Sequence, residues 1–149
     1  MILTILLNIL SYYKSLDLNK QSFTLQSLKL IDQEIFNVKK DKPLLVYVWA
    51  TWCPICKIES NHIQTLSNYF EVLTIAVDSG SDEDLKKYLM ENNFNFKVYN
   101  DKNRAISSQM NIKGYPTIFI YDKQKQLQFT DVGYTSTFSL YLKMLWAGL

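Results

Sequence analysis

The chain has 149 residues, of which 48% are hydrophobic and 20% are charged, and its formal net charge is +2. This length fits one domain with a core large enough to be stable without cross-links. The small net charge and the lack of a long basic run argue against nucleic acid as a partner.

The N-terminus stands apart, because residues 1–13, MILTILLNILSYY, form an almost unbroken apolar run. As a helix the run would extend about 20 Å, short of the roughly 30 Å of a bilayer core. It lacks a basic n-region and an A-x-A-like cleavage site, unlike a secretory signal. We expect a membrane anchor, complete or truncated; the alternative is an amphipathic helix packed on the domain. Only Lys14 and Lys20 flank the run, and by the positive-inside rule alone they would favour a cytoplasmic domain.

The polar residues 14–21 predict a linker to a folded domain that spans residues 22–149. Alternating apolar and polar residues from Phe23 to Leu30 predict a strand, and the EIFNV segment that follows predicts its short return. Pro43–Ala50, PLLVYVWA, is a continuous apolar run of the kind found in a central strand covered on both faces. Pro54 suits the first turn of a helix, which we expect to run to about Phe70.

Strands and helices alternate through the rest of the chain. Val72–Asp78 predicts a second buried strand, and SDED from Ser81 has the form of a capping box that starts a helix. Further along we expect a short strand in FKVYND, a short helix in KNRAISSQM, strands at Pro116–Asp122 and Gln126–Gly133, and a last helix capped by Thr135 or Ser136. This alternation predicts an α/β domain with a sheet covered on both faces.

Cys53 and Cys56 are the only cysteines of the chain and lie between the central strand and its helix. At a helix N-terminus, unpaired N–H groups and the positive end of the dipole stabilise a thiolate at Cys53. Cys56 lies one turn further, close enough to form a disulfide. Closing so small a loop stabilises a fold poorly, and a zinc or copper site needs more ligands than this pair and His62. We therefore predict a redox-active pair and no metal site.

The stretches VWATWCPICKIES and GYPTIFIYD together resemble the thioredoxin superfamily. The CPIC motif, Glu59 three residues after it, and a β-α-β stretch from Val72 to Tyr99 are similar to the membrane-anchored thiol–disulfide oxidoreductases of the TlpA, ResA and DsbE kind. Within these, the chain looks closest to the copper-sensitivity-suppressor (ScsD-like) branch. The resemblance covers residues 22–147. It implies a thioredoxin fold, with a central mixed β-sheet flanked by helices and a β-α-β insertion between the CxxC helix and the cis-proline strand.

The resemblance also implies roles for single residues. Cys53 would be the nucleophile, Cys56 the resolving thiol and Pro116 a cis-proline that faces the disulfide. The backbone of Tyr115 would then face an extended substrate strand, which pairs with it by β-augmentation. The side chain of Tyr115 is bulkier than that of many relatives, which leaves the substrate preference open. The residues expected to bind substrate are Trp52, Pro54, Tyr115 and Thr117.

Glu59 is the expected proton-transfer residue, since it matches the acidic position of ResA-like proteins. Burial of its carboxyl would raise its pKa toward the range useful for proton transfer. His62, one turn on, is expected to be a partly buried histidine with one hydrogen bond, or to share a proton with Glu59. Thioredoxin has a buried aspartate six residues before its first cysteine, but this chain has Tyr47, which cannot serve as that base. Helical periodicity places Glu59 and His62 on one apolar face with Ile55, Ile58, Ile63, Leu66, Tyr69 and Phe70.

The resemblance implies an enzyme that exchanges disulfides with protein substrates and needs no cofactor beyond its own Cys53–Cys56 disulfide. It implies a reductase domain anchored to the inner membrane, facing the periplasm and supplied with electrons by a DsbD-like membrane protein. The direction depends on the reduction potential, so an oxidase stays open. A copper(I) metallochaperone would use the same two thiolates. A thiol peroxidase would carry a threonine where this chain has Ala50, and a redox-inactive scaffold is the last alternative.

Overall fold

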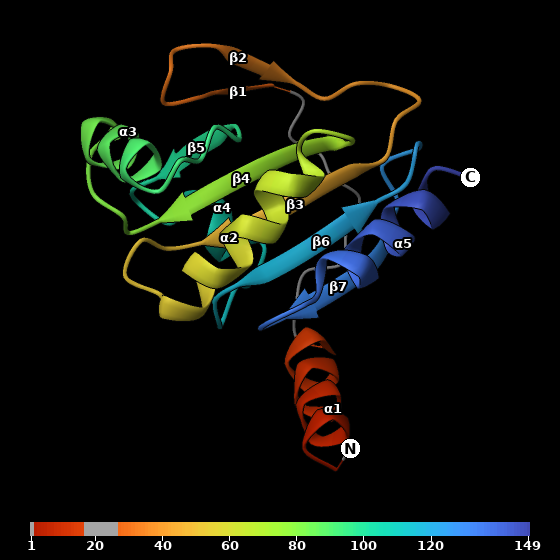
Figure 1. Ribbon diagram of the computed structural model, residues 1–149. Helices are drawn as coiled ribbons and strands as arrows, with labels where there is room; N and C mark the ends of the chain where they lie inside the picture. Colours follow the sequence, from red (N-terminus) through yellow and green to blue (C-terminus); the bar gives the residue numbers. More distant parts are fainter. Residues whose placement is uncertain (1, 17–26) are drawn as a thin grey trace.

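A five-stranded sheet forms the centre of the computed structural model, which describes residues 2–16 and 27–149 (Figure 1). The strand order is β5-β4-β3-β6-β7. β3 pairs in parallel with β4 and antiparallel with β6, so the sheet is mixed, as the resemblance implies. The strands are β3 (Leu44–Trp49), β4 (Glu71–Val77), β5 (Val98–Asp101), β6 (Thr117–Tyr121) and β7 (Leu127–Val132).

Every residue of β3 is buried, as its continuous apolar run predicts. Alternate side chains point to opposite faces of a strand, so β3 supplies both apolar cores of the domain. Tyr47 and Trp49 belong to the core on one face, and Val46 and Val48 to the core on the other. β3 is therefore the element from which both layers of packing are built.

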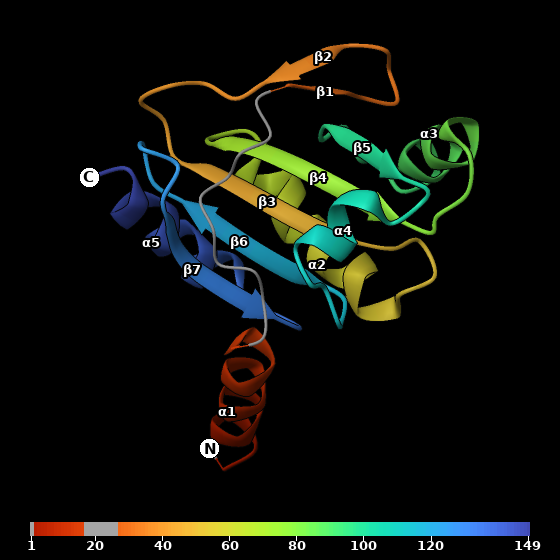
Figure 2. The ribbon, with the colours of Figure 1, turned by 180° about the vertical axis from the view of Figure 1, so that it is seen from behind.

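Helices cover both faces of the sheet (Figures 1 and 2). α2 (Pro54–Leu66) and α5 (Thr137–Ala147) lie on one face, and α4 (Ala105–Gln109) lies on the other. α3 (Asp82–Glu91) connects β4 to β5, so the predicted β-α-β stretch is present. Both hydrogen bonds of its capping box, between Ser81 and Asp84, are formed.

α2 ends at Leu66, one turn earlier than predicted, because a tight turn follows it before β4 begins at Glu71. Its predicted apolar face is wrong in part, since Ile55, Ile58 and Tyr69 are exposed. The buried side chains recur every three or four residues along the strip that contacts the sheet. They are Cys56, Glu59, Ser60, Ile63 and Leu66.

A separate antiparallel hairpin precedes the sheet, formed by β1 (Ser27–Lys29) and β2 (Ile35–Asn37). It confirms that a strand ending near Leu30 pairs with a short return. The first part of the predicted strand, residues 23–26, lies outside the described residues. Leu28 and Phe36 of the hairpin join the core on the α4 side of the sheet.

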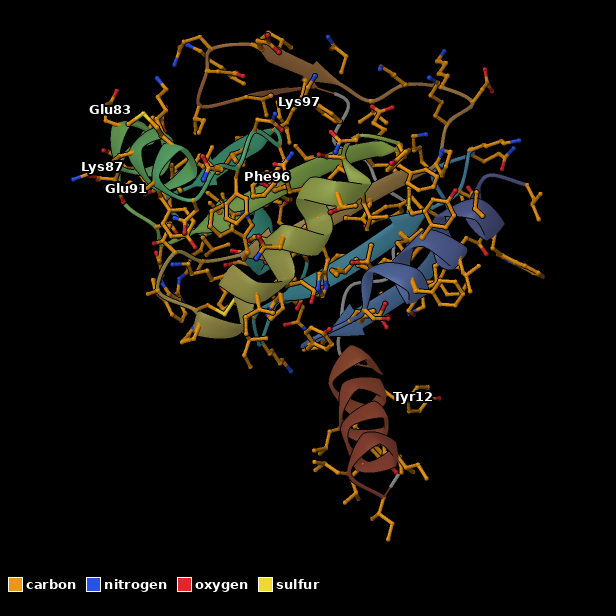
Figure 3. All side chains as sticks on the ribbon, viewed as in Figure 1. Tyr12, Glu83, Lys87, Glu91, Phe96 and Lys97 are labelled. Carbon is orange, nitrogen blue, oxygen red and sulfur yellow. A yellow bond between two sulfur atoms is a disulfide. The ribbon has the colours of Figure 1, made fainter. Side chains whose placement is uncertain are left out.

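α1 (Ile2–Leu16) extends beyond the predicted apolar segment and includes the first three residues assigned to the linker. The remaining linker residues, 17–21, lie outside the described residues. α1 contacts β7 at one end and projects away from the domain, with Tyr12 pointing outward (Figures 1 and 3). Its exposed apolar side chains are Ile2, Leu3, Ile5, Leu6, Ile9, Leu10, Tyr12 and Tyr13. Across residues 2–16 and 27–149, no helix has the length and apolar character needed to cross a bilayer.

The N-cap residue of α4 is Arg104, which has a left-handed backbone with φ of 54° and makes no side-chain capping hydrogen bond. Asp101, at the end of β5, takes over this function from a buried position. Its carboxylate accepts hydrogen bonds from the backbone N–H groups of Ile106, at 3.2 Å, and Ser107, at 2.8 Å. A carboxylate near the first turn also interacts favourably with the helix dipole. The start of α4, and with it Arg104, is therefore fixed to the sheet.

Candidate functional site

The two cysteines form a disulfide at the end of β3, with their Cα atoms 5.2 Å apart. Cys53 is the N-cap of α2, and its Sγ accepts a hydrogen bond from the backbone N–H of Cys56 at 3.2 Å. Pro54 occupies the first turn, where the missing N–H costs nothing. Cys53 is 7% exposed and Cys56 has no exposed surface. An incoming thiol or disulfide therefore reaches the sulfur of Cys53 first.

The peptide bond between Tyr115 and Pro116 is cis, as predicted. Pro116 directly precedes β6, the antiparallel neighbour of β3. Its carbonyl accepts a hydrogen bond from the N–H of Gly133 at 2.8 Å. Thr117 is fully buried and its hydroxyl donates to the carbonyl of Gly114 at 2.7 Å. The Thr117 hydroxyl therefore supports the turn before Pro116, and a role of Thr117 in substrate binding stays a prediction.

The other residues expected to bind substrate are accessible. Trp52 is 56% exposed, Pro54 is exposed, and Tyr115 is half-buried. The rings of Trp52 and Tyr115 meet edge to face, with their centroids 5.6 Å apart. Ile55 and Ile58 are exposed on the first turns of α2, although periodicity assigned them to the core. Their closeness to the cysteines was the signal that could have placed them beside the disulfide.

Glu59 is buried one turn beyond Cys56. Its Oε2 accepts a hydrogen bond from the backbone N–H of Thr135 at 3.0 Å, whereas Oε1 has no hydrogen-bond partner in the part of the chain that the structure describes. Burial raises the pKa of the Glu59 carboxyl to about 7; the Thr135 hydrogen bond lowers it and nearby Asp131 raises it further. The carboxyl can therefore hold or release a proton near neutral pH.

His62 lies beside Glu59 and is partly buried, as expected. Its Nδ1 is 3.0 Å from the carbonyl oxygen of Thr135 and 3.7 Å from Oε2 of Glu59. The backbone of Thr135 thus contacts both side chains, its N–H bonded to the acid and its carbonyl to the imidazole. No sequence pattern indicated that Thr135 would contact Glu59, since 76 residues separate the two.

Tyr47 occupies the position of the aspartate of thioredoxin and lies behind the disulfide. Its hydroxyl donates to the carbonyl oxygen of Cys56 at 2.8 Å and lies 3.3 Å from Oγ of Ser60. Burial raises the pKa of the Tyr47 hydroxyl far above its ordinary value, so the group stays neutral. Tyr47 therefore anchors the first turns of α2 but does not exchange protons near neutral pH. The buried group near the disulfide that can do so is the carboxyl of Glu59.

The described residues contain no group of three or more histidines, cysteines or acids that could hold a metal ion. The chemistry that the site offers is that of its two sulfur atoms, a buried acid and an accessible apolar rim.

A family model described as the AhpC/TSA family matches residues 18–130. The chain belongs to this family of thioredoxin-like proteins. A thioredoxin-like protein of Haemophilus influenzae is 30% identical over 132 residues, covering 88% of this chain and 77% of that protein. Thiol:disulfide interchange protein DsbE of Vibrio cholerae is 30% identical over 108 residues, covering 70% of this chain and 56% of that protein.

Solved structures confirm the thioredoxin fold. A thiol:disulfide interchange protein of Chlorobium tepidum superposes with a TM-score of 0.72 at 22% identity, covering 88% of this chain and 99% of that one. A secreted disulfide oxidoreductase of Mycobacterium tuberculosis superposes with a TM-score of 0.68 at 19% identity, covering 80% of this chain and 93% of that one. The resemblance to the DsbE kind is thus confirmed, and assignment to the ScsD-like branch stays a prediction.

Replacing Glu59 with glutamine should flatten the pH dependence of the unfolding free energy. Between the ordinary pKa of 4.5 and the folded pKa of about 7, the folded protein binds more protons than the unfolded chain. Relative to Glu59→Gln, the wild type should therefore lose about 3 kcal/mol of stability as pH rises through this window, and the difference should then level off. Urea unfolding of wild type and Glu59→Gln at half-unit steps from pH 4.5 to 8 measures the difference.

Glu83→Gln is the matched control, because Glu83 lies on the outer side of α3 (Figure 3) and is exposed. The unfolding free energy of this variant should change with pH as steeply as that of the wild type. If the unfolding free energies of wild type and Glu59→Gln changed in parallel with pH, the carboxyl of Glu59 would have the same pKa in the folded and the unfolded chain, which contradicts the prediction.

Proposed function

We propose that the protein is a thiol–disulfide oxidoreductase that exchanges disulfides with protein substrates through Cys53 and Cys56. The observation that carries the proposal is a disulfide at the N-terminus of α2, exposed only at Cys53, in a domain with a cis-proline before β6. The names of the relatives, thiol:disulfide interchange protein DsbE among them, support it. Ala50 provides no hydroxyl where a thiol peroxidase would carry a threonine.

The reaction in the reducing direction begins with the thiolate of Cys53, which attacks one sulfur of a substrate disulfide. That bond breaks, the second substrate sulfur leaves as a thiolate and takes up a proton, and a mixed disulfide remains. The thiol of Cys56 then loses its proton and attacks Sγ of Cys53, which releases the other substrate sulfur. Two electrons pass to the substrate, and the protein ends with its Cys53–Cys56 disulfide.

The surrounding residues assist separate steps. The N–H of Cys56 and the positive end of the α2 dipole stabilise the thiolate of Cys53. Glu59 accepts the proton of Cys56 when the mixed disulfide is resolved, as its pKa of about 7 allows. An extended substrate strand lies along the backbone of Tyr115, with Trp52 beside it.

Replacing Cys56 with serine should trap substrates as mixed disulfides, whereas replacing Cys53 should trap about one tenth as much or less, because Cys56 is buried. Each variant is mixed with insulin, and adducts are quantified by non-reducing electrophoresis and intact mass. Alkylation of the reduced wild type at pH 7 is the second measurement, and Cys53 should react first. Faster alkylation of Cys56, or equal trapping by Cys53→Ser, would reverse the two roles.

The protein acts as a reductase in this proposal and receives electrons from a DsbD-like membrane protein. Equilibration of the Cys53–Cys56 pair with glutathione buffers, followed by mass spectrometry, measures its reduction potential. We expect a reduction potential close to that of thioredoxin, about −270 mV. A reduction potential close to that of DsbA, about −120 mV, would instead identify an oxidase that accepts electrons from substrate dithiols.

The exposed apolar side chains of α1 support attachment of the domain to the inner membrane, with its disulfide on the periplasmic side. The helix has 15 residues and covers about 22 Å, so by itself it would insert into the interface. In cells the protein should fractionate with membranes, and deletion of residues 1–21 should release it. Cys53 should react with a membrane-impermeant thiol reagent in cells with an opened outer membrane. Labelling only after lysis would place the domain in the cytoplasm.

A further inference from the structure

A loop at the end of β4, Asp78–Gly80, holds the two residues that precede Cys53. The indole Nε1–H of Trp52 donates to the carbonyl oxygen of Asp78 at 3.1 Å. The backbone N–H of Thr51 donates to Oγ of Ser79 at 3.0 Å. The segment that leads into the disulfide is therefore attached to this loop at two neighbouring residues.

The loop has an unusual backbone that other contacts maintain. Asp78 has a φ of 46° and Gly80 a φ of 90°, and the left-handed region is rarely adopted by residues other than glycine. Ser79 Oγ donates to the carbonyl oxygen of Val77 at 2.9 Å, and Nδ2 of Asn100 donates to that of Gly80 at 3.1 Å. The position of the Asp78 carbonyl thus depends on side-chain bonds made by the loop.

Arg104 provides the outermost of these bonds. Its Nε and Nη2 both contact Oδ2 of Asp78, forming an ion pair between the loop and the start of α4. The side chains are 56% and 37% exposed, respectively, and ion pairs so exposed contribute little to global stability. The residue whose carboxylate binds Arg104 is the same residue whose carbonyl binds the indole of Trp52. Loss of the ion pair therefore removes one of the contacts that position Asp78, and through its carbonyl the indole of Trp52, without removing any core contact.

We propose that Arg104 and Asp78 are positioning residues that hold Trp52 against Tyr115, and that these two rings form one wall of the surface that binds a polypeptide substrate. The inference rests on the proposed function. Trp52 is 56% exposed, and a large side chain so exposed samples several rotamers unless its polar atom is bonded. Fixing the ring before binding lowers the entropy lost when a substrate packs on it. The wall should matter for an extended polypeptide and much less for a small disulfide that contacts only the sulfur of Cys53.

The first test follows the ring itself. The chain has three tryptophans, so protein labelled with 5-fluorotryptophan gives three 19F signals, which single Trp→Phe variants assign. In Arg104→Met and in Asp78→Asn, the Trp52 signal should shift or broaden while those of Trp49 and Trp146 stay in place. Arg104→Lys should partly restore it. Asparagine tolerates the left-handed backbone at position 78, so Asp78→Asn removes the charge with little change in the loop.

Lys87→Met is the matched control, because it removes a cation from an exposed ion pair, Lys87 with Glu91 at 3.9 Å on α3 (Figure 3). It should leave all three signals unchanged. An unmoved Trp52 signal in both Arg104→Met and Asp78→Asn would overturn the proposal.

The second test compares substrates. Arg104→Met should lower kcat/KM for insulin reduction by about 3- to 10-fold, mainly through KM, and should lower kcat/KM for a small aromatic disulfide less. Equal losses for both substrates, or an unchanged KM for insulin, would overturn the role of the wall in substrate binding. A wild type that reduces neither disulfide would refute the proposed function, while the 19F spectra would still decide whether Arg104 positions Trp52.

Discussion

Burial of β3 on both faces is the constraint on which the rest of the molecule depends. A strand covered on both sides must find its hydrogen-bond partners in the sheet, and β3 has β4 on one edge and β6 on the other. The chain can therefore leave the sheet only at the end of the strand, where Cys53 starts α2. The same pairing places β6, with Pro116 before it, next to β3. The reactive sulfur and the cis-proline thus occur at one end of the sheet because of how a single strand is packed.

Within that frame, the burial of polar groups decides the chemistry. Tyr47 and Glu59 both lie in the core beneath the disulfide, and burial raises the pKa of both side chains. The ordinary pKa of the phenol is already so high that the group stays neutral, whereas the pKa of the carboxyl is raised into the range of cellular pH. Burial thus produces one structural anchor and one group that can exchange protons. The difference lies in the ordinary acidity of the two side chains.

The fold and the reactive pair were predictable from the sequence because their signals are local. The apolar run of β3, the proline at the start of α2 and the spacing of the cysteines each act within a few residues. The apolar face of α2 was less predictable, since Ile55 and Ile58 have the right periodicity but face the rim of the site. Thr135 and Arg104 could not be found from the sequence. Their contacts depend on loops that the folded sheet brings together from distant parts of the chain.

The hydrogen bond from the N–H of Thr135 to Glu59 lowers the pKa of the buried carboxyl, so this pKa depends on the C-terminal part of the chain. Thr135 immediately precedes Ser136, whose hydroxyl accepts a hydrogen bond from Ser139 N–H at 3.3 Å and caps α5. The donor to the carboxylate and the first turn of α5 therefore share one short piece of backbone. Substitutions in that turn, or exchange of the last helix between relatives, can change the pKa of Glu59 while every residue of α2 stays the same. The pKa of Glu59 can therefore be changed by residues in about the last tenth of the sequence, independently of the CPIC motif.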